Sequence, residues 1–180
     1  NRGKGYAVRR GFDAAEEEVL MILDADMSVV PEELPGFFSL LNEGRCDFVN
    51  GTRMLYPMQK GAMRLLNHMG NKLFGFFMTF LLGQQVTDTL CGTKALFKKD
   101  YRRMKMGIDR WGDFDLLFGA AQAGLHIMEM PVHYKRRRQG QSKMRTMRHA
   151  LHLLKVCFHG ICRLTLWDKP CKRLSSEVRS

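Results

Sequence analysis

Two carboxylates stand one residue apart at the end of an apolar run, Asp24 and Asp26 after residues 19–23. A continuous apolar run predicts a strand that is covered on both faces, as in a parallel α/β sheet. Such folds bind ligands at the carboxyl ends of their strands. Aspartate also favours turns and helix caps, which would explain one of the two residues more easily than both. The pair therefore predicts hard oxygen ligands for Mg²⁺ or Mn²⁺, with room left for substrate phosphates.

The elements around this pair alternate between helical and strand patterns, which is typical of the α/β class. Helical patterns cover residues 5–18, 31–42, 61–82 and 112–123, and strand patterns cover residues 19–23, 47–51, 93–97 and 125–134. Pro31 predicts a helix start. Pro131 interrupts the last strand, so that strand is expected at an edge or a bend of the sheet.

The positive charge is concentrated in one part of the chain. Residues 1–134 carry 16 basic and 16 acidic side chains, whereas residues 135–180 carry 13 basic and 2 acidic ones. This distribution indicates an anionic partner or, alternatively, a solvated tail. A nucleic-acid-binding module is disfavoured, because residues 135–148 contain no aromatic side chain on which bases could stack.

Motifs in a fixed order extend the pattern beyond the acidic pair. They are Asn1-x-Gly3-Lys4-Gly5, Leu23-Asp24-Ala25-Asp26, Asn50-Gly51-Thr52-Arg53, Arg64 with Asn67 and Asn71, Asp88-Thr89-x-Cys91-Gly92-Thr93-Lys94, Gly112-Asp113-Phe114-Asp115, and Arg138-x-Gly140-x-Ser142-Lys143. Together they resemble the family 2 inverting glycosyltransferases. The branch with the greatest similarity contains dolichyl-phosphate mannose synthase and the bacterial polyprenyl-phosphate sugar transferases. The resemblance covers roughly residues 1–150.

The resemblance implies a GT-A (Rossmann-like) fold, a mostly parallel sheet flanked by helices, with a nucleotide-diphospho-sugar donor and a divalent metal. Family members carry further strands before the part matched by residue 1, so residues 1–149 are expected to form a partial GT-A domain. Residues 150–180 are expected to form a basic amphipathic helix and tail. By position, Asp24 would lie by the ribose and the metal, and Asp26 would bind the metal. Ser28 stands where relatives often have a glutamine that joins the metal shell.

Basic residues at the motif positions suit two phosphate groups. The Gly-rich turn with Lys4 and Arg9 precedes a helix and could bind the donor phosphates. Arg138 and Lys143 lie in a loop that closes over the donor in the family. One guanidinium group can donate two hydrogen bonds to the oxygens of a phosphate. Arg53 and Arg64 are expected to bind the acceptor phosphate.

Three further carboxylates are candidate catalytic residues: Asp88, Asp113 and Asp115. A hydroxyl acceptor needs a base in an inverting displacement, and Asp113 is the candidate. A lipid phosphate is already an anion, in which case Asp113 would orient sugar hydroxyls. Asp88 and Asp115 are expected to face the sugar or the acceptor, although Asp115 could equally be a surface carboxylate.

The apolar run at residues 73–82 is too short to cross a membrane. It could form part of the core, whereas the resemblance implies a helix along the membrane that admits a lipid phosphate acceptor. Reduced cysteines favour a cytoplasmic location at the membrane face. Two alternatives remain open: a family 2 enzyme acting on a glycan or other hydroxyl, and an inactive fragment that serves as a binding module.

Overall fold

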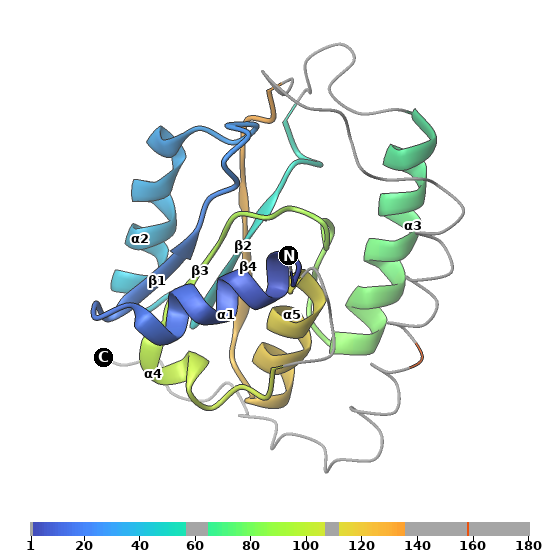
Figure 1. The fold of residues 1–180 in the computed structure, drawn as a ribbon. Coiled ribbons are helices and arrows are strands. Elements are labelled where there is room, and N and C mark those ends of the chain that lie inside the picture. The colour runs from blue at the N-terminus through green and yellow to red at the C-terminus, as the bar shows by residue number, and fades with distance from the viewer. Residues whose placement is uncertain (1, 57–64, 107–111, 136–157, 159–180) are drawn as a thin grey trace, which may run out of the picture.

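The computed structural model describes residues 2–56, 65–106, 112–135 and 158, with only the backbone described for residues 65–68. Four strands form one sheet in the order β1-β3-β2-β4. Their bounds are β1 Val19–Ile22, β2 Phe48–Thr52, β3 Lys94–Phe97 and β4 Ile127–Pro131. These strands confirm the four predicted ones, and β4, which ends at Pro131, lies at an end of the sheet as expected. Figure 1 shows the four strands with the helices around them.

The expectation that neighbouring strands of the sheet pair mostly in parallel is wrong. β3 pairs antiparallel with both β1 and β2, and β2–β4 is the parallel pair. The strands β1, β2 and β4 nevertheless run in one direction, because β3 is inserted between β1 and β2 with the opposite direction. The carboxyl ends of three strands and the start of β3 therefore lie at the same edge of the sheet.

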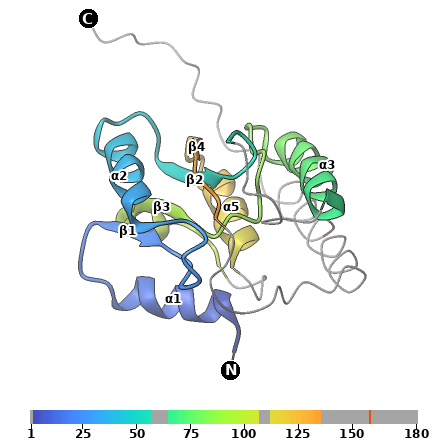
Figure 2. The ribbon, with the colours of Figure 1, turned by 90° about the horizontal axis from the view of Figure 1, so that it is seen from above.

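Helices cover both faces of this sheet. Their bounds are α1 Lys4–Ala14, α2 Leu34–Asn42 after a 3₁₀ turn at Pro31–Glu33, α3 Leu65–Leu82, α4 Lys98–Tyr101 and α5 Asp113–Gln122. Figure 2 shows α1 and α2 on opposite sides of the sheet. The short helix α4 was not predicted from the sequence. The mixed α/β architecture confirms the expected GT-A class of fold.

Alternating side chains of the strands build a separate core on each face. Leu20, Phe48 and Leu96 point toward α1, α3 and α5, where Phe114 is also fully buried. On the opposite face, residues such as Val49 and Ala95 pack against α2, which contributes Phe37 and Leu41. Both faces of the sheet are thus covered, which explains why β1 reads as a continuous apolar run in the sequence.

Helix α3 has two apolar faces with different surroundings. Its inner face, which includes Asn71 and Met78, is buried. Its outer face exposes a row at helical spacing, with Met69 60%, Leu73 73%, Phe76 77% and Phe80 84% exposed. The helix thus contributes to the core and also leaves an apolar stripe uncovered within the described structure. In the described part of the chain, no helix combines the length and the apolar character that crossing a bilayer requires.

Candidate active site

The strand directions bring together residues that are far apart in the sequence. Asp24 follows β1, Arg53 follows β2, and Lys94 begins β3. The cross-strand register places Lys94 opposite both Ile22 and Asn50. Three of the motif segments therefore meet at one edge of the sheet, where α/β folds hold their ligands.

Asp24 and Asp26 lie in a tight turn after β1. The amide of Met27 donates to the carbonyl of Asp24 at 3.2 Å, and the amide of Ser28 donates to Asp26 Oδ1 at 3.0 Å. Met27 has a φ of 54°, a left-handed conformation that is uncommon for a residue with a side chain. The acidic turn is thus held in a special backbone conformation, as is frequent at functional sites.

A lysine–aspartate cluster of Lys4, Asp24, Lys94 and Asp113 lies beside this turn. Lys4 Nζ contacts Asp24 Oδ1 at 2.8 Å and Asp113 Oδ1 at 3.6 Å. The fully buried Lys94 contacts the same Asp113 oxygen at 3.4 Å and also donates to the carbonyl of Cys91. The Lys4 and Asp24 side chains remain 33% and 36% exposed, so a ligand can reach this pair.

Because Gly92 has no side chain, the carboxylate of Asp24 can lie directly beside its backbone. A Cβ atom at Gly92 would lie 2.2 Å from Asp24 Oδ2 and 2.6 Å from Lys4 Nζ. Any side chain there would displace both charged groups. The glycine in this motif therefore has a physical role in the site.

The N-termini of α1 and α5 meet at the same place. A Cβ atom on Gly112 would lie 2.8 Å from Gly5 Cα, so the two helix starts are in backbone contact. Each helix N-terminus carries a positive partial charge, and two together favour an anion. Further along α1, Arg9 Nη1 pairs with the buried Asp115 Oδ2 at 3.2 Å. The two side chains join α1 to α5, which differs from the expectation that Arg9 faces donor phosphates and Asp115 the sugar or acceptor.

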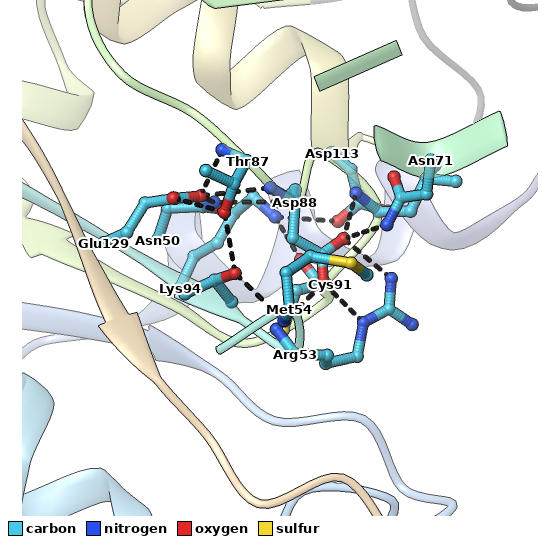
Figure 3. A network of polar contacts seen from close by, with 12 residues as sticks. Asn50, Arg53, Met54, Asn71, Thr87, Asp88, Cys91, Lys94, Asp113 and Glu129 are labelled. Carbon is cyan, nitrogen blue, oxygen red and sulfur yellow. Dashed lines mark hydrogen bonds and ion pairs between the residues drawn. The ribbon is translucent and has the colours of Figure 1, made fainter. Parts of the chain in front are cut away.

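The second group of polar residues is an arginine network of Asn50, Arg53, Asn71, Asp88 and Glu129 (Figure 3). Arg53 donates through Nε to Asp88 Oδ2 at 2.6 Å and through Nη2 to Asp88 Oδ1 at 2.7 Å. Asp88 is 0% exposed and Arg53 is 8% exposed. Asp88 was expected to face the sugar or acceptor. It is instead buried against Arg53, because burial of the arginine requires an opposite charge.

Glu129 holds the chain segment that carries Asp88. Its carboxylate accepts from the Thr87 amide at 2.8 Å, the Asp88 amide at 3.1 Å and the Thr87 hydroxyl at 2.6 Å. Asn50 Nδ2 donates to Glu129 Oε1 at 3.1 Å and to the Asp88 carbonyl at 2.9 Å. Strands β2 and β4 thus fix the position of Asp88 from both its backbone and its side chain.

The charges in the two groups change pKa values in ways that follow from these contacts. Burial alone would raise the pKa of Asp88, but the charge and hydrogen bonds of Arg53, with the hydrogen bond from Asn71, hold it below the usual 3.8. Burial alone would lower the pKa of Lys4, but Asp113 and Asp24 hold it above the usual 10.5. Both groups are therefore ionised at neutral pH.

Sequence interpretation gave no role to two residues of this site. Lys94 lies in the motif of residues 88–94, but its contact with Asp113 depends on the meeting of β3 and α5. Glu129 was not singled out at all. A carboxylate within the apolar strand pattern of residues 127–131 is the signal that would have found it, since such a group requires polar partners.

Some predicted site residues lie outside the described part of the chain. These are Arg64, Arg138 and Lys143, together with residues 150–157 and 159–180 of the predicted C-terminal segment. The point where the basic segment begins is described: the amide of Lys135 donates to the carbonyl of Ser28 at 2.8 Å. Tyr134 lies under Arg53, with the guanidinium carbon 5.0 Å from the ring centroid. The basic segment thus starts beside the acidic turn.

The acidic turn fits a divalent cation in part. Asp24 and Asp26 supply carboxylate oxygens, and Mg²⁺ is commonly bound by one or two carboxylates plus substrate phosphates and water. Among the residues that the structure describes, no group of three His, Cys, Asp or Glu side chains could hold a metal. A metal here would therefore depend on the diphosphate and water for its remaining ligands.

The described fold is thus an α/β sheet that carries an acidic turn, two helix N-termini and the buried Lys94 and Arg53 at one edge. The family model for glycosyl transferase family 2 matches residues 1–104, and the chain belongs to this family.

Curated relatives identify the branch within the family. The chain is 35% identical to a dolichyl-phosphate hexose transferase of Haloferax volcanii, an alignment that covers 79% of this chain and 61% of the relative. It is 26% identical to a polyprenol monophosphomannose synthase of Mycolicibacterium smegmatis, over 88% of this chain and 59% of the relative. It is 27% identical to an undecaprenyl-phosphate mannosyltransferase of Micrococcus luteus, over 79% and 57%. The chain thus spans somewhat more than half the length of these three relatives.

Proposed function

We propose that this chain carries out the inverting transfer of a sugar from a nucleotide-diphospho-sugar to a polyprenyl or dolichyl phosphate, at the cytoplasmic face of a membrane. One observation carries the proposal. The acidic turn of Asp24 and Asp26 and the buried Arg53 lie at one edge of the sheet, beside a helix whose apolar stripe is exposed within the part of the chain that the structure describes. Two of the three relatives described above are named as transferases of dolichyl phosphate and undecaprenyl phosphate, and the third as a polyprenol monophosphomannose synthase, which supports the choice of acceptor.

The donor would bind on the side of the lysine–aspartate cluster. Asp24 and Asp26 would hold Mg²⁺ or Mn²⁺, which neutralises charge on the leaving diphosphate when it is bound. Lys4 and the N-termini of α1 and α5 offer further positive charge to the phosphates. Arg138 and Lys143 would add to this from the segment that starts at Lys135.

The acceptor phosphate would approach Arg53 and Arg64. A phosphate oxygen of the lipid forms a bond to the anomeric carbon, and the bond from that carbon to the diphosphate oxygen breaks with inversion. The lipid phosphate is an anion, so no proton has to be removed from it. Asp113, whose Oδ1 contacts both Lys4 and Lys94, would orient sugar hydroxyls. Asp88 and Asp115 would act by holding Arg53 and Arg9.

The apolar stripe of α3 supports a membrane-surface location. It consists of Met69, Leu73, Phe76 and Phe80, which are at least 60% exposed and lie on one side of the helix. An amphipathic helix of this kind can lie in the interface plane with its apolar face among the lipid headgroups and chains. The lipid acceptor would then reach Arg53 from the side of α3.

The acceptor class can be tested with paired acceptors. The full chain is incubated with Mn²⁺, a panel of nucleotide sugars, and either a polyprenyl phosphate or the matching polyprenol in vesicles. We expect glycolipid from the phosphate alone. Product from the polyprenol would favour the hydroxyl-acceptor alternative. Absence of product with every donor, together with no binding of any donor, would favour the inactive binding module.

A further inference from the structure

Asn71 connects helix α3 to the arginine network. Its Nδ2 donates to Asp88 Oδ1 at 2.8 Å, and the same oxygen accepts from Arg53 Nη2 at 2.7 Å. The Asn71 side chain is buried, and its Oδ1 has no hydrogen-bond partner within the described structure. The donation to Asp88 is therefore the contact that orients this amide, as Figure 3 shows.

The backbone of α3 approaches the Asp88 segment closely at the next turn. A Cβ atom on Gly75 would lie 2.5 Å from the carbonyl oxygen of Thr87. One further turn along, Thr79 Oγ1 accepts from the Val86 amide at 3.0 Å and donates to the Val86 carbonyl at 3.1 Å. Three successive turns of α3 thus contact residues 86–88, and Asn71 is the one whose hydrogen bond reaches Asp88.

The hydrogen bond from Asn71 to Asp88 lies on the inner face of α3, and the exposed apolar stripe lies on its outer face. Leu73 and Phe76 point outward, whereas Asn71 and Gly75 point toward the Asp88 segment. A force on the outer face that moves the helix would therefore act directly on Asp88 through the hydrogen bond from Asn71, and on its neighbours Thr87 and Val86 through Gly75 and Thr79. Since Asp88 holds both Nε and Nη2 of Arg53, the guanidinium would follow.

We propose that Asn71 is a positioning residue, which couples the seating of α3 on a lipid surface to the orientation of Arg53 for the acceptor phosphate. The inference rests on the proposed function and adds to it a route from the membrane-facing stripe to the acceptor site. Asn71 itself would not touch the acceptor. Asn71 orients the Asp88 carboxylate, which in turn orients the Arg53 guanidinium.

The sharpest test is Asn71→Asp, which keeps the shape of the side chain but replaces the donor with a second carboxylate against Asp88. Thr79→Val is the matched control, because it removes the neighbouring contact of α3 without touching the network. We expect Asn71→Asp to raise the KM for polyprenyl phosphate in vesicles by about tenfold or more, since it removes a hydrogen bond to a charged group. The KM for the nucleotide sugar should stay within about twofold for both variants.

A short-chain, water-soluble prenyl phosphate separates coupling from a general defect. Wild type should prefer the vesicle-bound acceptor, and Asn71→Asp should lose that preference, while Thr79→Val keeps it. Asn71→Ser retains a hydroxyl donor and should recover part of the preference. Thermal unfolding of each variant shows whether it is folded; if Asn71→Asp is not, the comparison of Asn71→Ser with Thr79→Val decides.

The outcomes separate the two proposals. Wild type that forms no glycolipid would overturn the proposed function and this inference with it. Wild type that is active, with the acceptor KM unchanged in Asn71→Asp or raised equally in Thr79→Val, would overturn the inference alone.

Discussion

The lysine–aspartate cluster and the arginine network are both built from opposite charges at the same edge of the sheet, but they differ in access to water. In the first, the closest ion pair joins side chains that are about one third exposed. In the second, Asp88 is fully buried and meets Arg53 through two short hydrogen bonds. An accessible pair can exchange its partner for a ligand at small cost, whereas a buried pair cannot. The comparison assigns exchange of an ion-pair partner for a ligand to the first group, whereas in the second group Asp88 holds Arg53 in a fixed orientation toward the proposed acceptor phosphate.

Removing the carboxylate of the buried pair should have the largest effect on stability. Asp88→Asn keeps the shape of the side chain but leaves the Arg53 charge buried without its partner. We expect the free energy of unfolding to fall by about 3–5 kcal/mol. Denaturant unfolding of wild type and variant measures this. A loss below about 1 kcal/mol would mean that the arginine network is not a fixed support.

The same residue predicts a dependence on pH. The folded pKa of Asp88 lies below its ordinary value of 3.8, so its contribution to stability is present above that value and is lost as pH falls through the folded pKa. The difference in unfolding free energy between wild type and Asp88→Asn should therefore be constant near neutral pH and should shrink below the ordinary carboxyl pKa. A difference that does not change with acid would contradict the buried pair as its source.

Weakening the support of Asp88 should have an intermediate effect. Glu129→Gln leaves one acceptor oxygen for contacts that a carboxylate now makes with two. We expect a loss of about 1–3 kcal/mol in unfolding free energy. Glu33→Gln is a control at a carboxylate that contacts the exposed His133. If both variants lose the same amount, the network has no special role in stability.

The accessible pair should show the reverse behaviour, with a small effect on stability and a large one on activity. Lys4→Met removes the ammonium between Asp24 and Asp113, and the unfolding free energy should change by roughly 0–1 kcal/mol. The rate of sugar transfer should fall about 10²-fold, because a preorganised cation toward the phosphates is lost. Unfolding and steady-state rates measured on the same preparation test this. A variant that is strongly destabilised, or that is fully active, would contradict the division between the two groups.

Sequence reasoning predicted the strands and most helices because local patterns determine them. The run at residues 19–23 identified β1, and Pro131 identified an edge strand. The insertion of β3 between β1 and β2 was not foreseen, since strand order depends on contacts between distant segments. The same reason explains the partners of Asp88. Its residue type and position in a motif indicated a functional site, but only the meeting of β2, α3 and the segment before β3 showed that it holds Arg53.

The acidic turn shows what a motif can establish by itself. Asp24-Ala25-Asp26 predicted ligand binding at a strand end, and the turn after β1 lies where this requires. The pattern did not show that Lys4 pairs with Asp24, because that contact needs the start of α1 to lie against the sheet edge. Glu129 was not predicted as a site residue for a similar reason, since its partners Asp88 and Thr87 lie 41 and 42 residues away in the chain.

The central claim, that the acidic turn serves metal-dependent sugar transfer to a lipid phosphate, is tested most directly with Asp26→Asn. The asparagine can still accept from the Ser28 amide, so the turn should keep its shape while the metal ligand loses its charge. The measurement is glycolipid formed from polyprenyl phosphate and nucleotide sugar, with Mn²⁺ and with chelator, for wild type and variant. We predict Mn²⁺-dependent product from wild type and a loss of at least about 10²-fold in the variant. Equal product from both proteins, or product that persists in chelator, would contradict it.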